Sequence, residues 1–167
     1  MEPTASYNSQ QAEATYLKLR SQILKMDPAE VGITPSRLLP NVWGVVIETG
    51  YKEAPVSLVA LADGTASLYF GTGGGMLGGG RIPAVANAAR ALVSAAVDFV
   101  LDMPPTKSYP LPAVGEVKFI LLTFSGKYAQ SAQVNDLARG QHLLSPLYFR
   151  GEEVITQFRL HSQKKNN

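Results

Sequence analysis

Hydrophobic side chains recur along this chain at two different spacings. Over residues 10–26 they return every three or four positions, which predicts a helix with one apolar side. Three shorter stretches, rich in β-branched and aromatic residues, follow as predicted strands: residues 42–49, 56–62 and 65–70. Asp63-Gly64 joins the last two, and Asp-Gly between apolar runs is typical of a β-hairpin with a type I′ turn.

The second half of the chain begins with a predicted helix over residues 82–101. Its apolar positions recur at helical spacing, and Pro83 stands in the first turn, where a missing N–H does no harm. Residues 103–115 contain four prolines and are too restricted for regular structure. We therefore expect a helix followed by a proline-rich connector.

Two strands and a helix complete the pattern. Residues 117–124 are strongly apolar and predict a strand, whereas residues 128–134 are mostly polar and suit a strand at the edge of a sheet. After a loop, Ser145-Pro146 resembles a helix start, with serine as the N-cap and proline following it. We expect this last helix to end near His161.

The order of these elements predicts one α+β domain over residues 10–162. Its core would be a mostly antiparallel sheet of about five strands with three helices, in the order α-β-β-β-α-β-β-α. Residues 1–9 and the basic tail 163–167 are predicted to be flexible. The set of elements is similar to that of small profilin-like and longin-like domains, an analogy of fold that implies no function.

Both sides of the strands at residues 42–48 and 117–124 are largely apolar, so both faces of the sheet need a cover. The three helices could divide between the faces. Alternatively, they could cover one face while a second copy of the chain covers the other. Because closed two-fold dimers are the commonest oligomers, we expect a homodimer.

Composition excludes several classes of protein. The 167 residues suffice for one domain with a core of its own, and the absence of cysteine excludes thiol catalysis, thiolate metal sites and disulfides. A net charge of +2 with scattered basic residues gives no reason to expect a nucleic-acid partner. The N-terminus lacks the pattern of a secretory signal, and the longest apolar stretch is interrupted by polar residues. We expect a cytoplasmic protein with no membrane partner.

Residues 71–80, GTGGGMLGGG, are unlike the rest of the chain because seven of the ten are glycine. Ordering a glycine costs about 0.5–1 kcal/mol more than ordering an alanine. Seven such residues would cost several kcal/mol, against a total domain stability of about 5–15 kcal/mol. The stretch is therefore either mobile or held in conformations that need glycine.

A glycine-rich loop that leads into a helix is one candidate binding site. Unpaired N–H groups and the positive end of the helix dipole favour a phosphate or carboxylate there. An arginine beside the loop could add a charge-assisted hydrogen bond. The candidate ligand-binding residues are Gly73, Gly74, Gly75, Gly78, Gly79, Gly80 and Arg81. The interpretation that we favour is structural: a flexible or tightly folded connection in which Met76 and Leu77 are fixed in the core and the flanking glycines act as hinges.

Two nucleotide-binding motifs match this stretch only in part. Gly73, Gly75 and Gly78 satisfy G-x-G-x-x-G, but the preceding strand is the second arm of a hairpin and does not open a βαβ unit. Residues 75–80 satisfy G-x-x-x-x-G, but Arg81 and the isoleucine after it replace the lysine and hydroxyl residue of a P-loop. We therefore reject both motifs.

Catalytic groups are sparse. The chain has two histidines, His142 and His161, and no nucleophile motif near either, so neither a His-rich metal site nor a catalytic triad is predicted. Glu152 and Glu153 are neighbours that point in different directions on the last helix and are interpreted as solvated. No cofactor or metal is predicted.

The sequence therefore favours a non-catalytic interaction or assembly module, with a homodimer or another protein as partner. The alternative is a binding protein or enzyme that holds a small anionic ligand, phosphorylated or carboxylated, at residues 71–81. Trp43 and Tyr51 flank the first strand and are interpreted as core residues.

Overall fold

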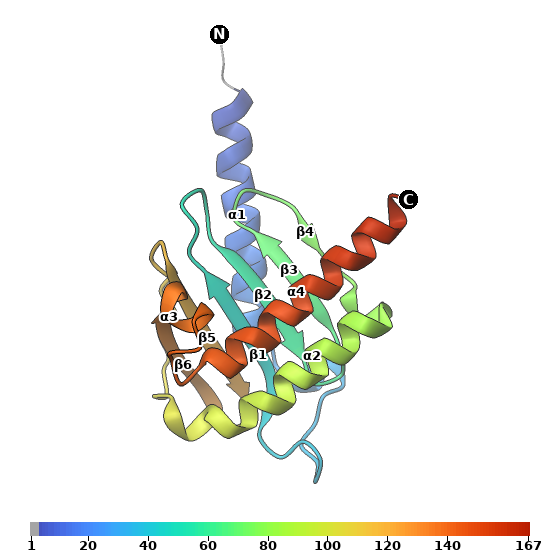
Figure 1. Ribbon diagram of the computed structural model, residues 1–167, viewed down its shortest axis with the longest axis vertical. Coiled ribbons are helices and arrows are strands. Elements are labelled where there is room, and N and C mark those ends of the chain that lie inside the picture. Colours follow the sequence, from blue (N-terminus) through green and yellow to red (C-terminus); the bar gives the residue numbers. More distant parts are fainter. Residues whose placement is uncertain (1–3) are drawn as a thin grey trace.

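The computed structural model describes residues 4–167, with side chains from residue 8. Within this range the strands are β1 (Val42–Thr49), β2 (Val56–Leu61), β3 (Ala66–Phe70), β4 (Gly75–Met76), β5 (Glu116–Thr123) and β6 (Gly126–Gln133). They form one six-stranded antiparallel sheet in the order β4-β3-β2-β1-β5-β6 (Figure 1). The predicted α+β class and antiparallel sheet are confirmed, and the polar strand β6 lies at an edge as predicted.

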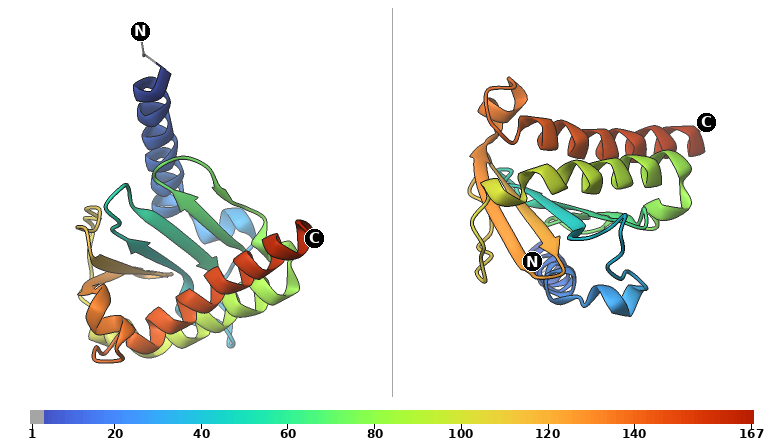
Figure 2. Two further views of the ribbon diagram at one scale, coloured as in Figure 1. Left: turned by 45° about the horizontal axis from the view of Figure 1, so that its top comes forward. Right: turned by 90° about the horizontal axis from the view of Figure 1, so that it is seen from below.

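Four α-helices occur in the described part of the chain: α1 (Thr4–Lys25), α2 (Pro83–Ala96), α3 (Val134–Ala138) and α4 (Ser145–Lys165). Short 3-10 helices are η1 (Pro28–Val31), η2 (Gly79–Arg81) and η3 (Val97–Asp102). Helices α2 and α4 lie on one side of the sheet, and α1 lies on the other (Figure 2). The helices thus divide between the faces, so a second copy is not required to cover a bare face. The homodimer itself stays a prediction.

Several boundaries differ from those expected. Helix α1 begins at Thr4, so the described part of the N-terminal segment predicted to be flexible, residues 4–9, is helical; residues 1–3 lie outside the described range. Helix α4 continues past His161 to Lys165. The short helix α3 and strand β4 were not predicted, because each is stabilised by tertiary contacts and not by a pattern of its own.

The hairpin between β2 and β3 is confirmed, but its turn is not type I′. A type I′ turn needs a positive φ at both central residues. Gly64 has a φ of +93°, but Asp63 has a negative φ, because among the described residues only glycines have positive values. Instead, the Asp63 carboxylate accepts a hydrogen bond of 2.9 Å from the N–H of Thr65. Arg90 of α2 donates to the Asp63 carbonyl at 3.0 Å and ties the turn to the helix.

The larger core lies between the sheet and the pair α2 and α4. Helix α2 buries alanines, including Ala86, Ala89 and Ala96, which let it lie close to the strands. Helix α4 approaches β1 at Gly151, where an added Cβ would lie 2.6 Å from Cδ1 of Ile47. Small residues on both helices therefore set how closely this layer packs on the sheet.

Within the described residues, one segment, Pro83–Asp102, is long and apolar enough to cross a membrane by length and composition alone. It forms α2 and η3, and the large apolar residues of α2, including Val85, Leu92 and Val93, are buried on the sheet. This is the arrangement of the core helix of a soluble domain.

Candidate functional site

The glycine-rich stretch is ordered by backbone hydrogen bonds. The N–H of Gly71 donates to the Pro55 carbonyl at 2.8 Å, and the N–H of Gly73 donates to the Phe70 carbonyl at 2.9 Å. Strand β4 then pairs with β3, with Met76 opposite Leu68. The stretch is thus a tight turn followed by a short edge strand and η2.

Most of its glycines are required by conformation or by packing. Gly73, Gly74 and Gly78 have φ angles of +117°, +77° and +75°, which residues with a Cβ adopt only rarely. A Cβ on Gly75 would lie 2.3 Å from the Leu68 carbonyl oxygen, and one on the buried Gly79 would lie 2.6 Å from Phe158. These contacts support the structural interpretation of the stretch.

The two apolar residues inside the stretch behave differently from each other. Met76 is half-buried and packs against the larger core. Leu77 is 65% exposed, so the expectation that both are fixed in the core is wrong for Leu77. It lies beyond the end of β4, where no further strand pairing holds it against the sheet.

A cavity of about 580 Å³ lies between this stretch, the start of α2 and the end of α4. Its lining residues are Gly75, Met76, Leu77, Gly78, Arg81, Ile82, Phe158, His161, Ser162 and Lys165. Three of these have basic side chains and none has a carboxylate. We call this the basic cavity.

The basic cavity brings together only part of the predicted site. Gly75, Gly78 and Arg81 line it, whereas the other predicted residues, Gly73, Gly74, Gly79 and Gly80, do not. His161 and Lys165, which sequence reasoning did not connect with the loop, come from the last turns of α4. Their spacing of four residues places them on one side of that helix, and this is the signal that could have paired them.

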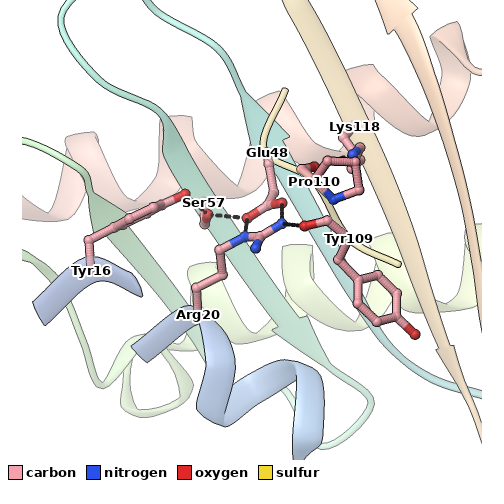
Figure 3. A network of polar contacts seen from close by, with 7 residues as sticks. All are labelled: Tyr16, Arg20, Glu48, Ser57, Tyr109, Pro110 and Lys118. Atoms are coloured by element: carbon pink, nitrogen blue, oxygen red, sulfur yellow. Dashed lines mark hydrogen bonds and ion pairs between the residues drawn. The ribbon is translucent and has the colours of Figure 1, made fainter. Parts of the chain in front are cut away.

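A row of polar residues crosses the sheet on the α1 side. The strand registers place Ser57 opposite Glu48, Glu48 opposite Lys118 and Lys118 opposite Ser131. Glu48, Ser57 and Lys118 are all buried, and Glu48 is 0% exposed. Buried charges in proteins are generally paired. Glu48 and Lys118 both form hydrogen bonds with groups from other segments of the chain (Figure 3).

Arg20 of α1 supplies the main partner. Its Nε donates to Oε2 of Glu48 at 2.7 Å, and its Nη2 donates to Oε1 at 2.8 Å, which makes a bidentate ion pair. Nη2 also donates to the Tyr109 carbonyl at 2.6 Å. The Lys118 ammonium donates to the Pro110 carbonyl. The network therefore holds both α1 and the proline-rich connector against the sheet.

Two hydroxyl groups extend this network. The Ser57 hydroxyl donates to Oε2 of Glu48 at 2.7 Å. Its single proton is used there, so in the 2.6 Å contact with Tyr16 the tyrosine hydroxyl is the donor. Arg20, Glu48, Ser57 and Tyr16 thus form one chain of hydrogen bonds from α1 to β1 and β2.

Burial and charge perturb the groups of this network in different directions. Burial raises the pKa of Tyr16 to about 12. Burial by itself would lower the pKa of Arg20, but the hydrogen bonds and charge of Glu48 outweigh it and the pKa is raised. Burial lowers the pKa of Lys118, partly offset by the charge of Glu48. At neutral pH Tyr16 is neutral and Arg20 is charged.

Sequence reasoning missed this network. Glu48 and Lys118 each stand as a single charge inside an apolar strand, and we interpreted both strands as apolar on both faces. The two residues become a cross-strand pair only when β1 and β5 are known to be neighbours. A lone acid in one apolar strand and a lone base in another are the signal that was available.

A second cavity, of about 330 Å³, lies beside the network on the α1 side. Tyr16, Gly71 and Thr72 line it, together with two carboxylates, Glu13 and Glu53. The glycine-rich stretch therefore contributes to two cavities whose charged side chains have opposite signs.

Trp43 and Tyr51, both interpreted as core residues, have different environments. Trp43 is buried and, among the described side chains, its indole Nε1 is the buried polar atom without a hydrogen-bond partner. It lines a cavity of about 450 Å³ next to η1. Tyr51 is 52% exposed, so the core interpretation is wrong for Tyr51. The chain turns away from the sheet after Thr49 and places this side chain beside α4.

Tyr51 belongs to an apolar region along α4, which we call the α4 surface. It has two parts: Tyr51, Tyr148 and Ile155 lie where α4 borders the sheet, and Phe149 and Leu160 are exposed on the outward side of the helix. Phe149 is 48% exposed and Leu160 is 43% exposed, while Tyr148 and Ile155 are half-buried. The rings of Tyr148 and Phe149 meet edge to face with their centroids 5.7 Å apart.

The sheet beside this surface is also incompletely covered. The cross-strand row of Thr49, Val56 and Phe70 is half-buried. The next row on the same face, Ile47, Leu58 and Leu68, is buried. Glu152 lies at the border of the surface, where burial raises its pKa. The charge of Arg159 offsets only part of this shift. Burial, and after it the charge of Glu152, raises the pKa of Tyr51.

The described residues contain no group of three or more His, Asp or Glu side chains that could hold a metal ion. No protein-family model matches the chain, and neither a curated protein nor a solved structure matches it significantly. The similarity to profilin-like and longin-like domains therefore stays an analogy of fold.

Proposed function

We propose that the domain is a non-catalytic interaction module and that its partner binds the α4 surface. One observation carries this proposal: aromatic and aliphatic side chains gather on the outside of a single helix and beside a half-covered row of the sheet. Single exposed apolar residues are ordinary, but a cluster of them is typical of a binding surface. Tyrosine and phenylalanine are also enriched at protein interfaces.

The buried polar network supports a non-catalytic role. Its central groups, Arg20, Glu48 and Ser57, hydrogen-bond to one another and to the connector. A catalytic acid, base or nucleophile needs contact with a substrate. This network instead attaches α1 and the connector to the sheet. We also propose that it acts in the cytoplasm, and the absence of cysteine is compatible with that reducing compartment.

Affinity capture from a cytoplasmic extract tests this proposal with matched variants. The tagged domain is mixed with the extract and with an untagged copy of the chain. We expect the wild-type domain to retain its partner, either the untagged copy or another protein, and Phe149→Asp to lose it, because a buried carboxylate would face the partner's apolar surface. Leu101→Asp is the control, since Leu101 is also exposed but lies on η3. Equal thermal unfolding temperatures would show that both variants are folded. Retention of the same proteins by all three chains contradicts the proposal.

A second candidate function is supported by the basic cavity. Arg81, His161 and Lys165 meet there without a carboxylate, and this combination favours a phosphorylated or carboxylated small molecule. A ligand that binds only the folded state stabilises it by about 2.7 kcal/mol at a hundredfold excess over its dissociation constant. Thermal unfolding with nucleotides, phosphate esters and organic acids tests this.

The variants for this second test differ by one position. Lys165→Glu reverses a charge that lines the basic cavity, and Lys164→Glu reverses an exposed charge that does not line it. We expect a stabilising anion to lose its effect on the first variant and to keep it on the second. Unchanged unfolding temperatures with every anion would reject the candidate.

A further inference from the structure

We propose that the partner of the α4 surface is a second copy of this chain, bound so that the two α4 helices pack antiparallel about a two-fold axis that passes next to Thr156, on the outward side of α4. This inference rests on the proposed function and names the partner. In the pair, Glu152 of each copy faces Arg159 of the partner subunit, and Phe149 of each copy faces Leu160 of the partner subunit.

The outward side of α4 has the spacing of a helix-packing face. Phe149, Glu152 and Thr156 follow one another at steps of three and four, and Arg159 and Leu160 lie three and four positions after Thr156. Residues at such steps lie on one side of a helix. Phe149, Glu152, Arg159 and Leu160 are exposed. The opposite side of the helix, with Gly151, Val154 and Phe158, is buried against the rest of the domain.

The order of these residues is complementary to its own reverse. From the middle of α4 toward its N-terminus, the helix presents Glu152 and then Phe149. Toward its C-terminus it presents Arg159 and then Leu160. Phe149 and Leu160 are centred within one residue of Ile155, and so are Glu152 and Arg159. One two-fold operation therefore makes both matches, as a symmetric interface requires, because residue i contacts j while j contacts i.

Charge selects the antiparallel direction. In a parallel pair, Glu152 would face Glu152 of the partner subunit, and Arg159 would face Arg159, which places like charges together. In the antiparallel pair, both contacts join opposite charges. Phe149 and Leu160 are 11 positions apart, about 16 Å at 1.5 Å per residue, so three helical turns contribute to the contact. The ring of Tyr148, which touches Phe149, extends the apolar part of the interface.

Charge reversal tests this interface by analytical ultracentrifugation over a range of protein concentrations. We expect the wild type to dimerise and the single variants Glu152→Arg and Arg159→Glu to raise the dimer dissociation constant at least about tenfold. Each substitution acts twice across the axis and turns attraction into repulsion. The double variant Glu152→Arg/Arg159→Glu restores opposite charges, so we expect its dissociation constant to return to within about threefold of wild type.

Two controls carry the same charge changes elsewhere on the surface. Glu30→Arg and Arg139→Glu alter exposed residues outside α4, and we expect dimerisation to be unchanged. A wild type that stays monomeric, or a double variant no tighter than the singles, would overturn the inference. The capture experiment would still test the proposed function. If another protein is the partner, the wild type and Leu101→Asp retain it and Phe149→Asp does not.

Cross-linking gives a second measurement that does not depend on the strength of the charge pairs. The chain has no cysteine, so a single introduced thiol reacts alone. Thr156→Cys places that thiol next to the proposed axis, and Ser94→Cys places it on an exposed position of α2. With a short bismaleimide, we expect covalent dimers from Thr156→Cys and none from Ser94→Cys. Equal dimer yields from both variants would contradict the proposed axis.

Discussion

Arg20 of α1 and Glu48 of β1 form a bidentate ion pair with N–O distances of 2.7 and 2.8 Å, and the Glu48 side chain is completely buried. The pair is also the main polar attachment of α1 to the sheet. Removing one member of such a pair leaves a buried charge without a partner, which is generally more destabilising than removing both.

We therefore expect Arg20→Met to lower the free energy of unfolding by about 3–5 kcal/mol. Adding Glu48→Gln to this variant removes the orphaned charge and should recover most of the loss. Urea denaturation measures both effects. Arg37→Met, at an exposed position between η1 and β1, is the matched control and should have no effect. A double variant as unstable as Arg20→Met alone would show that the charge of Glu48 is not the cause.

The pKa of Tyr16 predicts how stability depends on alkaline pH. Burial raises it from 10.0 to about 12, so the folded protein keeps the phenolic proton where the unfolded chain loses it. Stability that is fully present below about pH 10 should be lost as the pH rises to about 12, by on the order of 2–3 kcal/mol. Lys118 acts in the opposite direction, because its lowered pKa makes stability rise with pH below 10.5.

Comparison with Tyr16→Phe isolates the contribution of Tyr16, because both proteins share Lys118. Urea denaturation at several pH values between about 9 and 11.5 gives the two slopes. We expect the wild type to lose more stability with rising pH than Tyr16→Phe. Parallel curves would mean that the Tyr16 hydroxyl ionises in the folded state as readily as in the unfolded chain.

The glycine-rich stretch offers a test of its structural interpretation. An added Cβ at Gly79 would lie 2.6 Å from Phe158 and 2.9 Å from the Ala66 carbonyl oxygen. Overpacking of this kind costs about 1–3 kcal/mol, so we expect Gly79→Ala to be destabilised by that amount. Gly80→Ala, one residue further at an exposed position with its nearest contact at 3.3 Å, should be close to neutral. Equal unfolding free energies for the two variants would contradict this interpretation.

Five of the six strands were predicted to within two residues because their order of apolar side chains is local information, whereas β4 was not predicted. Strand β1 begins and ends where residues 42–49 predicted it. The Arg20–Glu48 pair was not predictable in the same way, because it joins residues 28 positions apart and depends on which strands are neighbours. Only the loop side of the basic cavity was predicted, because the other side is formed by residues distant in the sequence. Its loop side has a sequence signature, whereas His161 and Lys165 reach it through the path of α4.

Gly151 is a position where local preference and packing oppose each other. Glycine inside a helix costs about 1 kcal/mol relative to alanine, so the sequence alone marks it as a weak point in α4. In the structure it lets α4 approach β1, because a Cβ would lie 2.6 Å from Cδ1 of Ile47. That atom is the end of a side chain, so it can be removed without moving the backbone.

We expect Gly151→Ala alone to be near neutral, because the gain in helix preference is offset by the overlap. Ile47→Val alone should cost about 0.5–1.5 kcal/mol, since it leaves a small cavity. In the double variant the new methyl group occupies that space, so we expect a favourable coupling energy of about 1 kcal/mol in a double-mutant cycle. Urea denaturation of the four proteins measures it. Additive effects would show that Gly151 and Ile47 do not limit the distance between α4 and the sheet.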